Sequence, residues 1–193
     1  QTATALEEIR QLLDLPNTPS YIECYDISHT AGSEPVAAMV VFENGQPLRS
    51  AYRKFKIKSA IGGDDYGAMA EVLTRRMEEY LANRDSGVGF GRKPDLILLD
   101  GGSGQVAAVA PVLQQFSIDI PLYGLVKDDR HRTRALITAE GEEIGIQANQ
   151  AVFSLIGRIQ EETHRFAITY HRKLRSKRLK SSALDEIPGI GPK

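Results

Sequence analysis

Residues 96–105 have the sequence LILLDGGSGQ and constrain the fold more than any other stretch of the chain. Four consecutive aliphatic residues are typical of a strand buried on both faces, as in a parallel sheet. The aspartate that follows, Asp100, is succeeded by three glycines within four positions and then by a helical pattern. Two interpretations of this turn compete. Either the glycines cradle a nucleotide phosphate, or Asp100 holds a metal ion and the glycines admit a close neighbour.

Hydrophobic periodicity divides the rest of the chain into strands and helices. Strands are expected at 21–28, 35–42, 47–57, 95–99 and 121–126, and helices at 3–14, 63–83, 104–116 and from 149 onward. Asn44-Gly45 predicts a tight turn between the second and third strands, and 135–146 predicts a further hairpin. Three meandering strands followed by α/β units predict a mixed five-stranded sheet with helices on both faces.

The bulk composition is that of an ordinary globular chain, 193 residues long and 41% hydrophobic. It contains no apolar run long enough to cross a membrane and no signal-peptide pattern. The single cysteine, Cys24, predicts a buried core residue in a reducing cytoplasm. Because the chain starts without Met and stops at Pro192-Lys193, we expect a fragment of a longer protein.

The net charge of −1 gives no reason to expect a polyanionic partner, but the distribution of charge does. Residues 165–180, RFAITYHRKLRSKRLK, are rich in Lys and Arg and contain no acidic residue. Such asymmetry is a common electrostatic footprint of nucleic-acid binding. A second basic cluster, 53–58, falls on an expected edge strand, where we interpret it as protection against aggregation.

Two aspartates follow strands that we expect to be parallel neighbours. Asp26 lies near the end of strand 21–28, and Asp100 ends strand 95–99. The carboxyl ends of such strands open onto one crevice, where two ionised carboxylates would repel each other unless a divalent cation joined them. A Mg²⁺ or Mn²⁺ site is therefore the natural hypothesis. Either aspartate alone is more often a helix cap or a turn residue.

A histidine and a third acid are further candidates. His164 borders the apolar stripe of the last helix, so it either faces the crevice as a metal ligand or is a boundary histidine bonded to a carbonyl. Asp65 lies at the start of helix 63–83, where negative charge is favourable. The glycine turn has no Lys-Ser or Lys-Thr and no G-x-G-x-x-G pattern, so it does not fit a nucleotide-binding loop.

Several long motifs together resemble a known family. These are YIECYDISHT, GDDYGAMAEVLTRR, PDLILLDGGSGQ, LVKDDRHRT, THRFAITYHRKLRSKR and LDEIPGIGPK. They resemble, in order, the C-terminal half of the UvrC family, the incising subunit of the bacterial nucleotide-excision repair nuclease. The resemblance implies a ribonuclease H-like fold, and hydrolysis of a DNA phosphodiester on the 5′ side of a lesion. It also implies a part in the SOS response to DNA damage.

The resemblance also implies roles for particular residues. Asp26, Asp100 and His164 match the family's Asp-Asp-His triad, and Asp65 matches a further acid to which we assign a supporting role. The triad implies a Mg²⁺ or Mn²⁺ cofactor, with His164 either a ligand or a group that positions water. Ser103 departs from the family, because many relatives carry a basic residue there, so a phosphate contact from this side chain is not expected.

The implied organisation is an endonuclease domain over 1–180, including the N-terminal helix, followed by 181–193. In this last segment IPGIGPK resembles the first hairpin of a helix-hairpin-helix module. The implied partners are damaged double-stranded DNA and the helicase subunit UvrB, through the rest of the full-length protein. Phosphate contacts are expected from Lys127, Arg130, Arg132, Arg165, Arg172, Lys173, Arg175, Lys177 and Arg178.

Two other classes of function share part of this pattern. A nucleic-acid-binding module without catalysis would carry the basic helix but would have no need of convergent carboxylates. A Rossmann-like enzyme would use the glycine turn to bind a nucleotide. Nicking of DNA that depends on Mn²⁺ distinguishes a nuclease from both.

Overall fold

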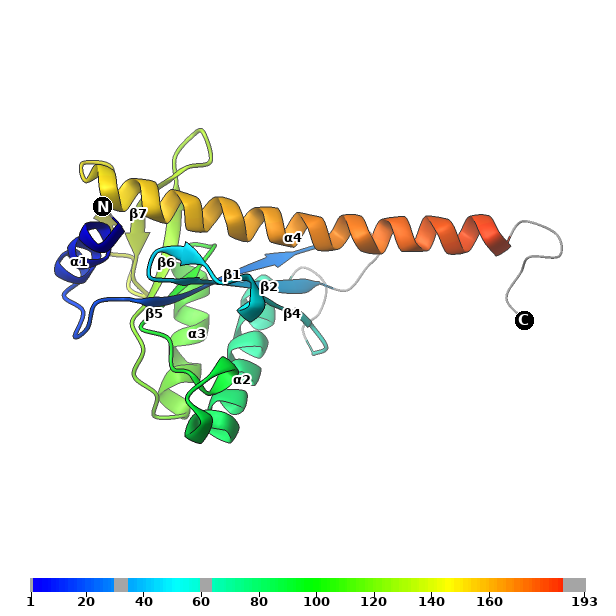
Figure 1. Cartoon of the computed structure of the whole chain (residues 1–193), viewed down its shortest axis with the longest axis horizontal. Helices are drawn as coiled ribbons and strands as arrows, with labels where there is room; N and C mark the ends of the chain where they lie inside the picture. The colour runs from blue at the N-terminus through cyan, green and yellow to red at the C-terminus, as the bar shows by residue number, and fades with distance from the viewer. Residues whose placement is uncertain (1, 30–34, 60–63, 186–193) are drawn as a thin grey trace.

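The structure, a computed structural model, describes residues 2–29, 35–59 and 64–185, with side chains described as far as residue 169. A single sheet lies between two layers of helices (Figure 1). The helices are α1 (Thr2–Leu13), α2 (Asp65–Asn83), α3 (Ser103–Gln115) and α4 (Gln150–Asp185). The strands are β1 (Tyr21–Ser28), β2 (Val36–Glu43), β3 (Gln46–Pro47), β4 (Arg53–Lys56), β5 (Leu96–Leu99), β6 (Leu122–Lys127), β7 (Thr133–Ile137) and β8 (Glu143–Gly145).

The sheet mixes parallel and antiparallel pairs in the order β3-β2-β1-β5-β6-β7-β8, with β4 also paired to β2. β1 runs parallel to β5, and β5 runs parallel to β6, so the carboxyl ends of these three strands lie at one edge. β2 and β4 extend the sheet antiparallel on one side, and β7 and β8 do so on the other. The predicted α/β class with a mixed sheet is therefore confirmed.

Alternating side chains divide the interior into two cores. Ile22 and Cys24 of β1 point to the face covered by α1 and α4, together with Leu96 and Leu98 of β5. Tyr21 and Tyr25, which have the opposite parity in β1, point to the face covered by α2 and α3. Because residues alternate along a strand, parity alone assigns every strand residue to one core or the other. Cys24 is fully buried, as expected of a core cysteine.

The sheet has more strands than the five predicted, eight within the described residues. The expected strand 47–57 is broken by a 3-10 turn, Arg49–Ala51, because Ala51 N and Tyr52 N bond backward to Leu48 and Arg49 within the turn instead of to β2. The hairpin expected at 135–146 is part of the main sheet. It begins two residues earlier, at Thr133, and its first strand continues the sheet beside β6.

The long helix α4 crosses the sheet on the core that it shares with α1, and Val152, Ile156 and Ile159 are buried there. It continues to Asp185, so it extends into the segment predicted as a linker. The predicted hairpin motif over 187–193 lies outside the described residues. Among the described residues, no helix is both long and apolar enough to cross a membrane.

An ion pair that the sequence pattern did not reveal is buried in the core beside α2. Arg76 donates to both carboxylate oxygens of Glu23, at 2.8–3.2 Å, and each side chain is about 1% exposed. Arg76 also donates to the carbonyls of Phe90 and Arg92, and Tyr25 donates its hydroxyl hydrogen to Glu23. These bonds fasten the glycine-rich connector to β1 and α2.

Candidate functional site

The two predicted aspartates lie at the ends of adjacent parallel strands. The ladder between β1 and β5 pairs Tyr25 with Leu99, and Asp100 N continues it by donating to Tyr25 O at 2.8 Å. At the next level of this ladder, which we call the Asp26 row, Asp26 therefore lies beside Asp100. Asp26 has the same parity as Cys24, and Asp100 the same as Leu98, so both belong to the α4 face of the sheet.

The electrostatics of this row are those of two carboxylates held in little water. Burial, and next the negative charge of Asp100, raise the pKa of Asp26 from 3.8 to about 7. The Asp100 side chain is only 3% exposed, and its buried Oδ1 accepts no hydrogen bond of normal geometry. The site thus concentrates negative charge that its own hydrogen bonds do not satisfy.

Lys127 supplies the positive charge nearest to this pair. Its Nζ forms an ion pair with Asp100 Oδ1, and its charge lowers the pKa of Asp26. The side chain reaches the site from the end of β6, where the register against β7 shifts between Val126 and Lys127. The sequence predicted Lys127 as a phosphate contact of a loop, and the structure shows it beside the carboxylates.

The donors of this row fit a hard divalent cation. Mg²⁺ and Mn²⁺ prefer carboxylate oxygens, and Mg²⁺ is commonly bound by only one or two protein carboxylates, with water or phosphate oxygens as the other ligands. Asp26 and Asp100 provide two such carboxylates, and Asp100 Oδ1 is met by the ammonium of Lys127 instead of by a hydrogen bond of normal geometry. Among the described residues, no group of three His, Cys, Asp or Glu side chains is arranged to hold a metal ion.

His164 lies on the helix that covers this row. The residue before it, Thr163, is fully buried and its hydroxyl contacts the thiol of Cys24, two positions before Asp26 on β1. The His164 side chain itself is exposed. The structure therefore brings the helical turn of His164 over the strand of Asp26, and the predicted role of the imidazole remains a prediction.

Asp65 approaches the site from the start of α2. Its charge contributes to the raised pKa of Asp26, after the larger effects of burial and Asp100. Asp65 Oδ1 contacts His29 Nε2 at 2.5 Å, and both side chains are about 40% exposed. His29 was not among the predicted site residues. Its position, three residues after Asp26, indicates that it lies at the same end of the strand.

Close packing explains two of the three glycines after Asp100, since a Cβ on Gly102 would have no neighbour within 4 Å. A Cβ on Gly101 would lie 2.4 Å from the Gln105 side chain, and one on Gly104 would lie 2.4 Å from the Tyr66 hydroxyl. Both distances are shorter than any normal contact. Gly101 therefore lets the first turn of α3 pack against the end of β5, and Gly104 lets the start of α2 approach the start of α3.

The predicted phosphate contacts fall into two groups. Arg132 and Arg165 are exposed but engaged by acids, Arg132 with Asp128 at 3.2 Å and Arg165 with Glu162 at 2.6 Å. Arg130 lies in the same turn as Arg132, where its N–H donates to Asp128. The side chains of the remaining predicted contacts lie outside the described residues; these are Arg172, Lys173, Arg175, Lys177 and Arg178.

Comparison with known proteins agrees with the geometry. The model of the UvrC RNase H endonuclease domain matches residues 10–168. The chain belongs to the UvrC RNase H endonuclease domain family. It is 52% identical to the UvrABC system protein C of Finegoldia magna over 89% of its length, and 50% identical to that of Caldicellulosiruptor saccharolyticus over 98%. These matches cover 28% and 30% of those proteins, so the chain spans about a third of their length.

The fold of a UvrC endonuclease domain is shared with a more distant protein. The crystal structure of human ENDOV superposes with a TM-score of 0.51 at 10% sequence identity, covering 85% of this chain and 90% of that one. At this identity the likeness shows the fold alone. The family model confirms the expected ribonuclease H-like architecture, and the alternative of a Rossmann-like nucleotide-binding enzyme is set aside.

Proposed function

We propose that this UvrC endonuclease domain hydrolyses a DNA phosphodiester on the 5′ side of a lesion in bacterial nucleotide excision repair. One observation supports the proposal most. Asp26 and Asp100 meet at the ends of two parallel strands, in a chain whose relatives are named for the UvrABC system. A binding module without catalysis has no use for a carboxylate whose pKa is raised to about 7 by burial beside a second carboxylate.

Asp26 and Asp100 are the proposed ligands of Mg²⁺ or Mn²⁺. Such an ion, when bound, activates a water molecule and neutralises charge on the scissile phosphate. The two aspartates contribute the negative charge that selects a cation over an anion at this row. Lys127 balances part of that charge, and its ammonium would be available to a phosphate oxygen if a cation took its place at Asp100.

His164 and Asp65 flank the two ligands in this proposal. We assign to His164, which is exposed on α4, the role of binding the ion or orienting water; its neighbour Thr163 contacts Cys24 on the strand of Asp26. Asp65 adds negative charge from the start of α2 and holds His29. The basic residues of α4 and of the turn 128–132 bind phosphates without reading bases, because a repair nuclease acts in any sequence.

The proposal includes partners that lie beyond this chain. Damaged double-stranded DNA is the substrate, and UvrB is the protein partner that delivers the lesion to the rest of the full-length protein. The names of the curated relatives, UvrABC system protein C, support a role beside the other Uvr proteins.

Nicking of duplex DNA with a single lesion tests the proposal directly. The chain is incubated with Mn²⁺ and substrate, alone and with UvrA and UvrB added, and compared with Asp26→Ala and Asp100→Ala variants. Both variants should lose nicking and keep most of their DNA binding, whereas Asp119→Ala, at an exposed aspartate, should match wild type. Undiminished nicking by Asp26→Ala would contradict the assignment.

A further inference from the structure

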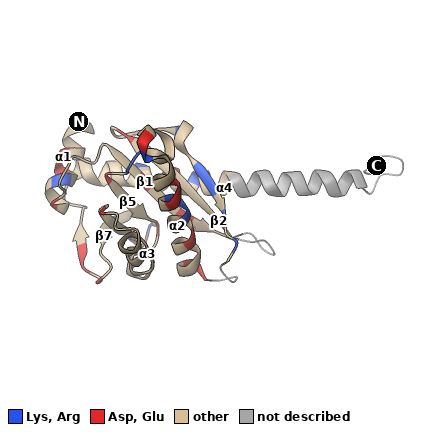
Figure 2. Cartoon of the chain, turned by 90° about the horizontal axis from the view of Figure 1, so that it is seen from below, with Lys and Arg blue, Asp and Glu red and all other residues tan. Residues whose placement is uncertain are grey.

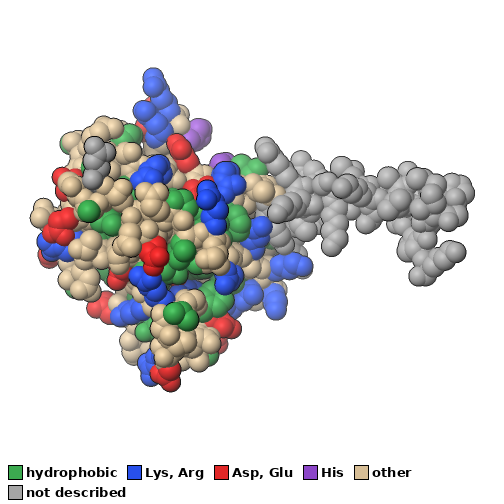
Figure 3. Space-filling model, viewed as in Figure 1, with side chains coloured by type: hydrophobic (Ala, Val, Ile, Leu, Met, Phe, Trp, Pro, Cys, Tyr) green, Lys and Arg blue, Asp and Glu red, His purple; other side chains and the backbone are tan. Residues whose placement is uncertain are grey.

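The edge strand β4 and the two residues after it concentrate positive charge. Residues 53–58 have the sequence RKFKIK, with four cations and no acid, and Arg53, Lys56 and Lys58 are exposed. None of these three forms an ion pair with an acidic side chain of the described residues. In Figure 3, Lys and Arg side chains gather in the region where Figure 1 places β4.

The register of the sheet aligns this charge with the candidate site. Asp26 pairs with Ala38 of β2, and Ala38 pairs with Lys54 of β4. Directly paired residues point to the same face, so Lys54 and Asp26 share the α4 face with only a methyl group between them. Lys54 Nζ lies 4.4 Å from the centre of the Phe166 ring of α4, which agrees with this direction.

The spacing suits a DNA backbone. Two strand-to-strand steps, from β1 to β2 and from β2 to β4, separate Asp26 from Lys54, a distance of about 10 Å. A DNA strand carries one charge per about 3.4 Å of helix axis, so this distance corresponds to roughly three phosphates. Lys56 lies one row further along the same face, because it pairs with Val36 opposite Ser28. A DNA strand that is cut at Asp26 and runs toward β4 would therefore pass Lys54 and Lys56.

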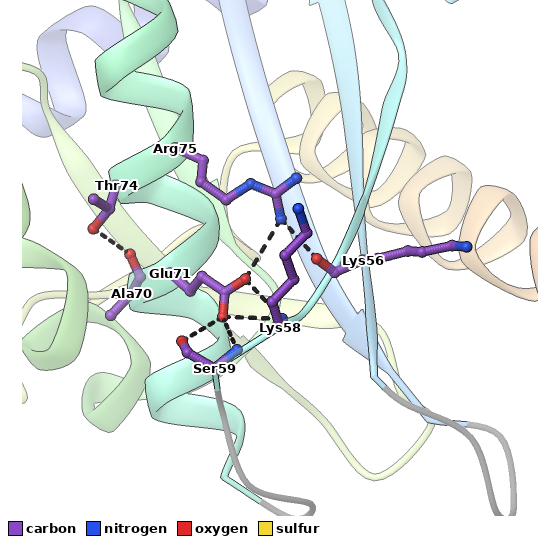
Figure 4. A network of polar contacts seen from close by, with 7 residues as sticks. All are labelled: Lys56, Lys58, Ser59, Ala70, Glu71, Thr74 and Arg75. Carbon is purple, nitrogen blue, oxygen red and sulfur yellow. Dashed lines mark hydrogen bonds and ion pairs between the residues drawn. The ribbon is translucent and has the colours of Figure 1, made fainter.

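Bonds from Glu71 and Arg75 of α2 fasten the backbone of this edge. Glu71 accepts hydrogen bonds from the N–H groups of Lys58 and Ser59 and from the Ser59 hydroxyl, at 2.6–3.2 Å (Figure 4). Arg75 donates to the carbonyl of Lys56 at 2.7 Å. Figure 2 shows both acidic and basic positions along α2, the helix from which Glu71 and Arg75 reach this backbone.

Protection against aggregation explains charge on an edge strand, but not this alignment. Any cation on β4 would block pairing with another chain, and the Glu71 bonds already occupy the amides that follow the strand. Lys54 and Lys56 lie on the same face of the sheet as Asp26, and protection against aggregation does not require that position.

We infer that Lys54, Lys56 and Lys58 form a track for the phosphate backbone of the DNA strand that is cut, beginning about three phosphates from the Asp26 row. The inference rests on the proposed function, because it assumes that the strand is cut at Asp26 and Asp100. The track binds backbone and not bases, since lysine recognises phosphate as a point charge.

The experiment compares two double variants that each remove two positive charges. Lys54→Gln with Lys56→Gln tests the track, and Arg84→Gln with Lys93→Gln removes exposed charge from the connector after α2 as the control. DNA affinity is measured by fluorescence anisotropy at several salt concentrations without divalent metal. Circular dichroism and melting temperature verify folding, and Lys58→Gln alone provides a milder variant.

The track variant should bind DNA more weakly than wild type. Each lost phosphate contact contributes about 0.9 to the slope of log affinity against log salt, so this slope should decrease in magnitude by about 1.8. The control should keep the wild-type slope, and Lys58→Gln should lose about 0.9. Equal slopes for the track variant and the control, in a chain that still nicks DNA, would overturn the inference and leave the proposed function standing. A wild-type chain that neither binds nor nicks DNA would contradict both.

Discussion

Neutralising Asp26 should stabilise the metal-free chain at alkaline pH. Burial, followed by the charge of Asp100, raises the pKa of this carboxyl from 3.8 to about 7. The folded chain therefore binds the proton more tightly than the unfolded chain does. The resulting stabilisation is fully present below the unfolded pKa near 4, and it is lost as the pH rises through the folded pKa near 7.

The magnitude follows from the size of the shift. Each pKa unit corresponds to about 1.4 kcal/mol, so a shift of about three units amounts to at most about 4 kcal/mol at pH 8. About 1.7 kcal/mol of this is already lost at pH 5, which leaves about 2.5 kcal/mol between pH 5 and pH 8. The Asp26→Asn side chain does not ionise, so its chain lacks this loss.

Urea unfolding followed by circular dichroism, in EDTA at pH 5 and pH 8, measures the difference. The stability of wild type relative to Asp26→Asn should fall by about 2.5 kcal/mol over this interval. Asp119→Asn, which neutralises an exposed aspartate, should follow the wild type at both pH values. Identical pH dependence in wild type and Asp26→Asn would refute the conclusion that Asp26 is buried beside a second negative charge.

Two further variants probe the core and the last helix. Glu23→Ala leaves the Arg76 charge buried without its partner and should cost about 3–5 kcal/mol, or roughly 6–20 °C in melting temperature for a chain of this size. Glu143→Ala, which breaks an exposed pair with Arg134, should cost less than about 1 kcal/mol, and a comparable cost for both variants would contradict the burial argument. His164→Ala should reduce Mn²⁺-dependent nicking while the DNA dissociation constant and the melting temperature stay near wild type. Normal nicking by this variant would exclude the imidazole from the reaction.

Local patterns were sufficient to predict most of the helices and strands. The β-branched and aromatic residues of 21–28 form β1 with the predicted bounds, and the apolar run at 95–99 forms the central strand β5. The parallel pairing of β5 with β6 was predictable, because α3 carries the chain from the end of one strand back to the start of the other. Asp26 and Asp100 come together although β1 leads into the antiparallel β2, because β1 also lies beside β5 and runs parallel to it.

The remaining features depend on contacts between distant segments. Arg76 and Glu23 are each unremarkable in a helix and a strand, and only the packing of α2 on β1 buries both. The break in the expected strand 47–57 arises from a short turn whose bonds compete with the sheet. Lys127 reaches Asp100 through an irregularity in the ladder between β6 and β7, which periodicity does not encode.

Diffraction from crystals soaked in Mn²⁺, recorded at the manganese absorption edge, tests the account most directly. An anomalous peak is expected between the carboxylates of Asp26 and Asp100, within about 2.0–2.6 Å of an oxygen of each. The Lys127 ammonium should withdraw from Asp100 in the same crystals. Manganese bound elsewhere, with Lys127 still paired to Asp100 and no peak between the two aspartates, would contradict it.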